Sequence, residues 1–286
     1  MMKTAILTDS NSGIFKEEAK QLNIFVVTMP IIIDDKEYFE GESLSHKEFY
    51  QLINESKKIT TSQPPMGVVI EKINHILSLG YDEIVYIPMS SGLSGSYQSA
   101  RTLVDNYSGK LYVVDNRGIS VTLRQAVLNA KKLADEGVDG YIIKDVLEKN
   151  VNNSFIYVGV ETLDYLKRSG RITKAGAAIG TFMHIRPLLV INGDKLDAYA
   201  KVRGTNNCKK LLINAVKRSV EKFKERGVKV SIGVAGSFLN EKDDEKWFKQ
   251  VKESFPNEEV YYNSLTLSVA SHVGPNAFGV GVSKKI

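Results

Sequence analysis

A turn of small hydroxyl residues and glycines is the stretch of this chain best suited to chemistry. It reads Ser-Ser-Gly-Leu-Ser-Gly-Ser over residues 90–96. A β-branched apolar run at 84–87 precedes it, and apolar residues at helical spacing follow, so we expect a strand, a turn and a helix. Backbone N–H groups at such a turn and the positive end of a helix dipole favour an anion. A serine-capped βα connection without a ligand explains the same residues equally well.

The same turn excludes several common sites. It contains neither the lysine of a GxxxxGK[ST] loop nor GxGxxG spacing, which argues against nucleoside triphosphates and dinucleotides. Ser94 also lacks the GxSxG context of a serine hydrolase nucleophile, so that class is disfavoured.

Four further polar stretches accompany this turn: Thr8-Asp9-Ser10, Thr61-Ser62-Gln63, Asp115-Asn116 and His272-Val-Gly-Pro275. Loops that follow parallel strands meet at the carboxyl edge of an open sheet, so we expect the N-terminal ones to converge there. They offer hydroxyls, amides and backbone N–H groups, with the carboxylates of Asp9 and Asp115. This set predicts an anion held by hydrogen bonds rather than by a full opposing charge. Taken singly, each serine or threonine has a cap or turn as its default role.

Three basic residues are candidates for the same site. His272 sits in a loop of small residues, although a lone histidine is more often structural. Arg168 and Arg171 bracket a Ser-Gly turn and have the geometry to clamp a phosphate or carboxylate, unless that turn is merely solvated. The other histidines (His46, His75 and His184) have no partner at metal-ligand spacing, so no metal site is expected.

Composition narrows the class of protein. The 286 residues are 43% hydrophobic with a net charge of +5, and their lysines and arginines are scattered, which disfavours nucleic acid binding. The single cysteine, Cys208, excludes an internal disulfide and fits a reducing compartment. No apolar run approaches the roughly 18 residues of a membrane span. We expect a soluble, cytoplasmic protein without stable membrane insertion.

The elements predict an α/β protein of two domains. Residues 1–152 alternate strands and helices, which predicts a three-layer domain with a mainly parallel sheet. Residues 153–286 mix helices with a hairpin at the Asn-Gly of 192–193, which predicts an α+β domain with a mixed sheet. A small-residue helix is expected at 175–183.

Taken together, the polar stretches resemble the DegV family across essentially the whole chain. The matching pieces keep their order and spacing: Thr8-Asp9-Ser10, Thr61-Ser62-Gln63-Pro64, Ser-Ser-Gly-Leu-Ser-Gly at 90–95, Gly170-Arg171-Ile172 and His272-Val-Gly-Pro275. The resemblance implies a two-domain protein that binds one long-chain fatty acid between its domains. It also implies a role as the lipid-binding subunit of bacterial fatty acid kinase, not catalytic alone. A separate ATP-binding subunit would convert the carboxylate to an acyl phosphate for phospholipid synthesis.

Carried over by position, the resemblance implies specific roles. Thr61, Ser62, Ser94 and Gly95 would hold the carboxylate, with His272 beside it. Arg171 would lie on the rim, facing the kinase subunit or the new phosphate. No cofactor other than the bound fatty acid is implied.

Two alternatives stay open at this point. One is a hydrolase or phosphotransferase acting on a small anionic substrate, with Ser94 as nucleophile and His272 as base. The other is a regulatory protein that senses a lipid in the same pocket without any kinase.

Overall fold

The N-terminal half is built around a four-stranded parallel sheet. The computed structural model describes residues 2–55, 58–178, 185–191 and 195–286. The sheet has the order β2-β1-β6-β7, and its strands are β1 (Thr4–Asp9), β2 (Phe25–Val27), β6 (Glu83–Ile87) and β7 (Leu111–Val113). Every residue of β1 and β6 is buried, as strands covered on both faces must be.

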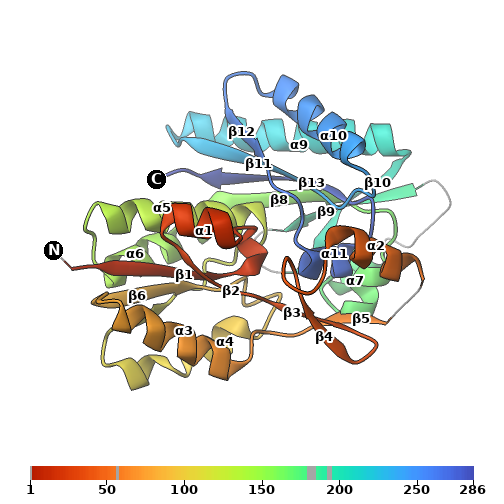
Figure 1. Cartoon of the computed structure of the whole chain (residues 1–286). Coiled ribbons are helices and arrows are strands. Elements are labelled where there is room, and N and C mark those ends of the chain that lie inside the picture. Colours follow the sequence, from red (N-terminus) through yellow and green to blue (C-terminus); the bar gives the residue numbers. More distant parts are fainter. Residues whose placement is uncertain (1, 56–57, 179–184, 192–194) are drawn as a thin grey trace.

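Helices cover both faces of this sheet (Figure 1). One face packs against α3 (Met66–Ser78) and α4 (Ser96–Arg101), and the other against α1 (Lys16–Leu22), α5 (Val121–Asp135) and α6 (Gly140–Lys149). Short 3₁₀ turns complete the connections, namely η1 (Ser10–Ser12), η2 (Val104–Tyr107) and η3 (Val151–Asn153). The expected three layers with a parallel sheet are therefore confirmed.

The C-terminal half forms a six-stranded mixed sheet of order β10-β9-β8-β13-β11-β12. All neighbouring pairs are antiparallel except β11 and β12. Its strands are β8 (Ser154–Gly159), β9 (Ile185–Ile191), β10 (Asp197–Arg203), β11 (Val230–Gly236), β12 (Glu259–Tyr262) and β13 (Phe278–Lys284). The mixed sheet is confirmed and lies after Asn153, while the expected domain limits at 152 and 153 stay a prediction.

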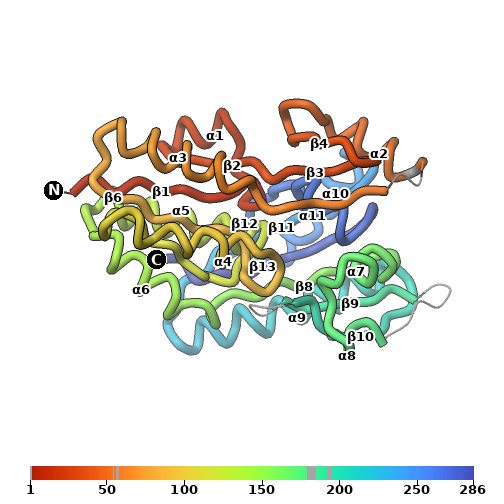
Figure 2. Tube along the Cα trace, turned by 90° about the horizontal axis from the view of Figure 1, so that it is seen from below, coloured from red at the N-terminus to blue at the C-terminus, as the bar shows by residue number. Residues whose placement is uncertain are grey.

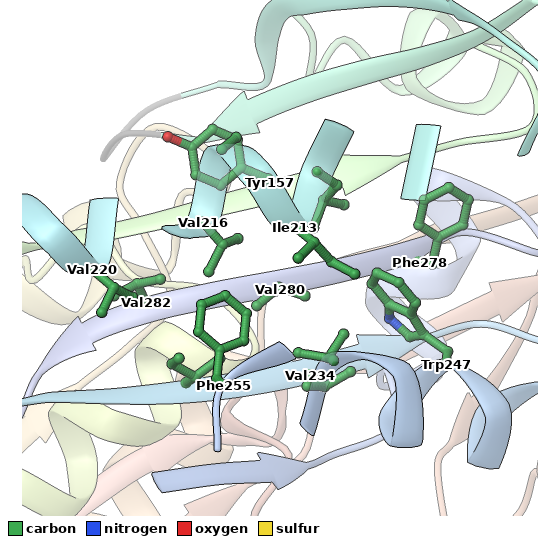
Figure 3. Packing of buried hydrophobic residues seen from close by; sticks show 14 of the residues in the cluster. Tyr157, Ile213, Val216, Val220, Val234, Trp247, Phe255, Phe278, Val280 and Val282 are labelled. Atoms are coloured by element: carbon green, nitrogen blue, oxygen red, sulfur yellow. The ribbon is translucent and has the colours of Figure 1, made fainter. Parts of the chain in front are cut away.

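A large apolar core fills the outer face of this sheet. Helices α9 (Thr205–Glu225) and α10 (Glu241–Ser254) cover it, and Trp247 contacts Phe278 edge to face with ring centroids 5.4 Å apart. Figure 3 shows this packing, with Val216 and Val220 of α9 directed at the sheet. The outer face is thus closed, and only the inner face of the sheet is free to border a ligand site.

Helix α5 joins the two sheets because glycines let it come close. It contacts β1 on one side and β11 and β13 on the other, and Figure 1 shows it between the sheets. A Cβ at Gly233 or Gly281 would lie 2.4 or 2.5 Å from side-chain atoms of Val121, too close for any larger residue. These two glycines therefore set the spacing between the halves.

A third, three-stranded sheet was not expected from the sequence. Its strands are β3 (Pro30–Ile33), β4 (Lys36–Phe39) and β5 (Ile59–Thr61), all paired antiparallel in the order β4-β3-β5. Helix α2 (His46–Asn54) packs on it, beside α7 (Asp164–Ser169) and α11 (Leu267–Val273). Figure 2 shows this group at the end of the molecule away from the N-terminus.

Some sequence expectations concern residues outside the described part. Helix α8 is described over Lys174–Ala177. The remainder of the expected helix at 175–183, the Asn-Gly turn of the hairpin and His184 lie outside the described residues. In the part of the chain that the structure describes, no helix is long and apolar enough to cross a membrane.

Candidate functional site

A pocket lies at the carboxyl edge of the parallel sheet, facing the inner side of the mixed sheet. Its volume is about 170 Å³, roughly ten times what one buried water needs. Residues following all four parallel strands reach it: Asn11, Met29, Met89 and Ile119. Of the predicted loops, those at 61–63 and 90–96 contribute lining residues. Asp9, Asp115 and Asn116 are not among the lining residues, so those parts of the predicted loops do not form the wall.

All six predicted site residues line this one pocket: Thr61, Ser62, Ser94, Gly95, Arg171 and His272. They come from four separate parts of the fold, namely the end of β5, the turn before α4, the segment after α7 and the last turn of α11. Their role toward a ligand remains a prediction.

Thr61 and His272 contact each other directly. The hydroxyl of Thr61 lies 2.8 Å from Nε2 of His272. Two sequence expectations are corrected here. Thr61 is the last residue of a strand, and His272 belongs to a helix rather than a loop. The helix forms because Thr266 begins it, a carboxylate oxygen of Glu40 accepts the Leu267 N–H at 2.8 Å, and Gly274, with φ 79°, ends it.

His272 is a neutral imidazole at physiological pH. Burial lowers its pKa to about 4, and the positive charge of Arg171 contributes to the same shift. Such a ring can give or take a hydrogen bond without adding charge to the site, but it is a weak proton acceptor.

Arg171 brings a positive charge into the pocket wall. Its Nε donates to the carbonyl of Leu93 at 3.4 Å, and its guanidinium also donates to the carbonyl of Ser169. Among the described residues no carboxylate pairs with it. The cation expected on the rim is thus one of the lining residues, and whether a ligand is held without a full countercharge stays a prediction. Arg168 does not join it, since it lies over the Tyr165 ring, 5.2 Å from the centroid.

Hydrogen bonds fix the hydroxyl turn at 90–96, the segment before it and the neighbouring Ser62. Ser94 Oγ lies 2.9 Å from Ser96 Oγ and accepts the Ser96 N–H, while Ser62 Oγ donates to the Gln63 carbonyl. The buried carboxylate of Asp9 accepts the N–H of Met89 at 2.7 Å and that of Asn11 at 2.9 Å. Burial raises the pKa of Asp9 to about 6. Asp9 thus fixes the base of the turn rather than the ligand.

The pocket is polar toward solvent and apolar toward the core. Thr61, Ser62, Ser94, Arg171 and His272 are partly exposed and Gly95 is exposed. The deeper wall is aliphatic and nearly fully buried, and includes Val158, Leu196 and Ala235. Sequence reasoning did not assign these residues, because an aliphatic strand residue has the same pattern whether it lines a cavity or fills a core.

In the described residues, no group of three or more histidine, cysteine, aspartate or glutamate side chains is placed to hold an ion. His46 instead pairs with the buried Glu40 at 3.0 Å.

Comparison with known proteins agrees with this architecture. The family model described as "Uncharacterised protein, DegV family" matches residues 3–285. The chain belongs to the DegV family. A DegV domain-containing protein of Streptococcus pneumoniae is 32% identical over 285 residues, covering 98% of each chain.

Two solved DegV structures show the same fold. A DegV family protein from Thermus thermophilus, described for its fatty acid binding, superposes with a TM-score of 0.88 at 26% identity, covering 99% of this chain and 100% of that one. A fatty-acid-binding DegV family protein from Streptococcus agalactiae gives a TM-score of 0.87 at 24% identity over the full length of both chains. At the latter identity the likeness concerns the fold alone.

Proposed function

We propose that this DegV protein is a carrier that binds one long-chain fatty acid and presents its carboxylate to a separate ATP-dependent kinase subunit. The observation that carries the proposal is the composition of the pocket: hydrogen-bonding and cationic groups toward the surface, aliphatic groups toward the core. A fatty acid has the same two parts. The fatty acid binding described for the Thermus thermophilus relative supports the same assignment.

The carboxylate would be held by hydroxyls, backbone N–H groups and Arg171. In the Nε2–H tautomer that we assign to His272, the ring donates to Thr61 Oγ1, which leaves the threonine proton for a ligand oxygen. Ser94 and the Gly95 N–H would supply further donors, and Ser62 would donate after its hydroxyl rotates away from the Gln63 carbonyl. Arg171, with no carboxylate partner among the described residues, would supply the opposite charge.

The acyl chain would supply most of the affinity. Each buried methylene contributes roughly 0.8 kcal/mol, so a sixteen-carbon chain offers on the order of 12 kcal/mol before ordering costs. The polar groups then fix which end of the ligand faces the surface.

An exposed carboxylate suits phosphoryl transfer from a partner. A carboxylate oxygen would bond to the γ-phosphorus of ATP held by the kinase subunit, while the bond from that phosphorus to the β,γ-bridging oxygen breaks. The products are an acyl phosphate and ADP. This protein would contribute orientation of the nucleophilic carboxylate and no covalent step of its own.

The enzyme alternative finds less support. A serine nucleophile needs a base within hydrogen-bond reach, yet Ser94 bonds Ser96 and His272 bonds Thr61. The low pKa of His272 also makes it a poor general base.

Binding to matched arginine variants tests the proposal. Arg171→Gln removes the pocket cation, and Arg168→Gln removes a cation three residues away that lies outside this pocket. We expect palmitate affinity to fall about tenfold to a hundredfold in the first variant, the usual range for a lost charged hydrogen bond. The second should bind as the parent does. Equal affinities in both variants would place the carboxylate elsewhere.

Kinase coupling needs a second experiment. Ser94→Ala should slow acyl phosphate formation by the lipid-loaded protein with an ATP-binding kinase subunit. Unchanged formation would exclude this turn as the reacting site. Lipid binding without any coupling would favour the sensor alternative.

A further inference from the structure

Ser120 is a polar residue of the pocket that the proposed carboxylate contacts do not use. It precedes α5, lines the pocket and is only 6% exposed. Its backbone has φ 51° and ψ −128°, a conformation that residues with a Cβ rarely adopt. Such strain persists only where the surrounding structure enforces it, and it tends to occur at ligand sites.

The hydroxyl of Ser120 has no hydrogen-bond partner among the described residues. The other hydroxyls of the pocket wall are all bonded: Thr61 to His272, Ser62 to Gln63, Ser94 to Ser96, and Ser268 to Asn11. Ser120 also makes no capping bond to α5. The hydroxyl of Ser231 is fully enclosed by protein atoms, whereas that of Ser120 is not. Since Ser120 lines the pocket, its hydroxyl faces the pocket.

Ser120 belongs to the deep, apolar part of the pocket. Its neighbours Ile119 and Val121 are buried in the aliphatic cluster of the inner face of the mixed sheet. Helix α5 contacts β1, β11 and β13, whereas the helix that carries His272 contacts β3, β5 and α7. Figure 1 shows α5 between the sheets and α11 beside the small sheet. Ser120 and His272 therefore lie on different elements, which contact different parts of the fold.

The first turn of α5 adds to the polarity at this point. The helix has 15 residues, and its first N–H groups lie at the positive end of its dipole. An unpaired hydroxyl beside this helix end offers a hydrogen bond to an electron-rich oxygen, inside a wall that is mostly aliphatic.

We propose that Ser120 and the first turn of α5 recognise an oxygen carried along the acyl chain, so that the pocket prefers hydroxy or oxo fatty acids to saturated acids of equal length. This inference rests on the proposed fatty acid binding. A plain alkyl chain would leave the hydroxyl dehydrated and unpaired, whereas a chain hydroxyl or carbonyl would pair with it.

Comparative binding of stearate and its hydroxy derivatives tests this inference. The ligands are stearate, 2-hydroxystearate, 10-hydroxystearate and 12-hydroxystearate, measured by calorimetry on lipid-free protein. The variants are Ser120→Ala and, as a matched control, Ser231→Ala, which removes another buried, unpartnered hydroxyl outside the pocket. We expect the parent and the control to bind one of the two mid-chain derivatives about tenfold more tightly than stearate. In Ser120→Ala this ratio should fall to about one, with stearate affinity unchanged.

Each other outcome overturns the inference in a recognisable way. A parent without mid-chain preference, or a preference that survives Ser120→Ala, excludes recognition by this hydroxyl. Equal weakening of all four ligands in Ser120→Ala would assign Ser120 to the carboxylate contacts instead. If the parent binds none of the four, the proposed function itself fails.

A second variant distinguishes the loss of the hydroxyl from a folding defect. Ser120→Gly removes the same hydroxyl while suiting the positive φ. It should lose the preference as Ser120→Ala does, and thermal unfolding of all variants identifies any that are not folded.

Discussion

At the scale of single residues, the pocket combines one permanent charge with a histidine that stays neutral. Arg171 lacks a carboxylate partner among the described residues, and it helps to keep His272 unprotonated. In the assigned Nε2–H tautomer the neutral ring donates to Thr61 Oγ1, so the threonine proton is left for a bound carboxylate. Arg171 would therefore supply the charge for a bound carboxylate, whereas Thr61 and His272 together would set the direction of a hydrogen bond to it.

Because the pKa of His272 falls from 6.5 to about 4 on folding, stability should depend on pH in that range. The unfolded chain takes up a proton below about pH 6.5 that the folded protein refuses until about pH 4, so stability falls as pH falls through this window. Between about pH 6.5 and pH 4 the parent should lose about 3 kcal/mol of stability through this residue, and His272→Gln should not show that loss. Urea unfolding at several pH values measures it.

The control is His75→Gln, at an exposed position on α3. The stability of His75→Gln should depend on pH in the same way as that of the parent. Asp9 works in the opposite direction, because its raised pKa gives stability at low pH that is lost as pH rises from 3.8 to about 6. Subtracting the unfolding free energies of the parent and His272→Gln at each pH gives the contribution of the histidine alone. If the two curves are parallel, His272 does not have the lowered pKa assigned to it.

At the scale of elements, two helices bring distant parts of the chain to the pocket. Helix α11 delivers His272 and is fixed at its first residue by Glu40, whose two carboxylate oxygens contact Leu267 N–H and His46. Helix α5 holds the two sheets together through Val121. The pocket thus depends on residues that never touch the ligand.

Replacing Glu40 by glutamine should loosen α11. An amide retains one acceptor oxygen, so either the helix N–H or His46 loses its partner, and we expect a cost of about 1–3 kcal/mol. Chemical denaturation measures it, with Glu37→Gln, exposed on the neighbouring strand, as the control. Equal stability of both variants would show that the buried carboxylate does not secure the helix.

A methyl group at position 281 should push α5 from the sheet. The Cβ of Gly281→Ala would meet Val121 Cγ2 at 2.5 Å, and we expect roughly 1–3 kcal/mol of destabilisation together with weaker lipid binding. The matched control is Gly67→Ala in α3, where no atom lies within 4 Å. That variant should gain up to about 1 kcal/mol, since alanine favours helices. Destabilisation by Gly67→Ala and not by Gly281→Ala would contradict this packing.

The sequence predicts some of these elements and not others. Buried strands such as β6 and the hydroxyl turn after it are visible as local patterns, and so are the residues that converge on the pocket. The small sheet and helix α11 are not visible locally. Helix α11 is short and depends on Glu40, which is 227 residues away in the chain. Nor does any local pattern distinguish Val158 or Ala235 as pocket wall, because only tertiary packing leaves space beside them.

At the scale of the whole molecule, the pocket runs from a partly exposed polar group into the space between the two sheets. The outer face of the mixed sheet is closed by α9 and α10, as Figures 1 and 3 show. A ligand with a long apolar chain would therefore bridge both halves, and binding should stabilise the molecule as one unit.

Lipid-free protein should melt at a higher temperature when palmitate is added. At a ligand concentration a hundred times the Kd, the gain is about 2.7 kcal/mol, or roughly 5 °C or more for a chain of this size. Butyrate at the same concentration should have little effect, because it buries few methylenes. Equal shifts with both acids would indicate a carboxylate effect without a chain pocket.

Whether this protein carries a long-chain fatty acid can be measured on the purified protein by native mass spectrometry, followed by organic extraction and lipid analysis. We predict a mass excess of a few hundred daltons that extracts as one or a few long-chain fatty acids. A protein whose mass is that of the bare chain, and stays so after incubation with palmitate and oleate, would contradict the carrier assignment.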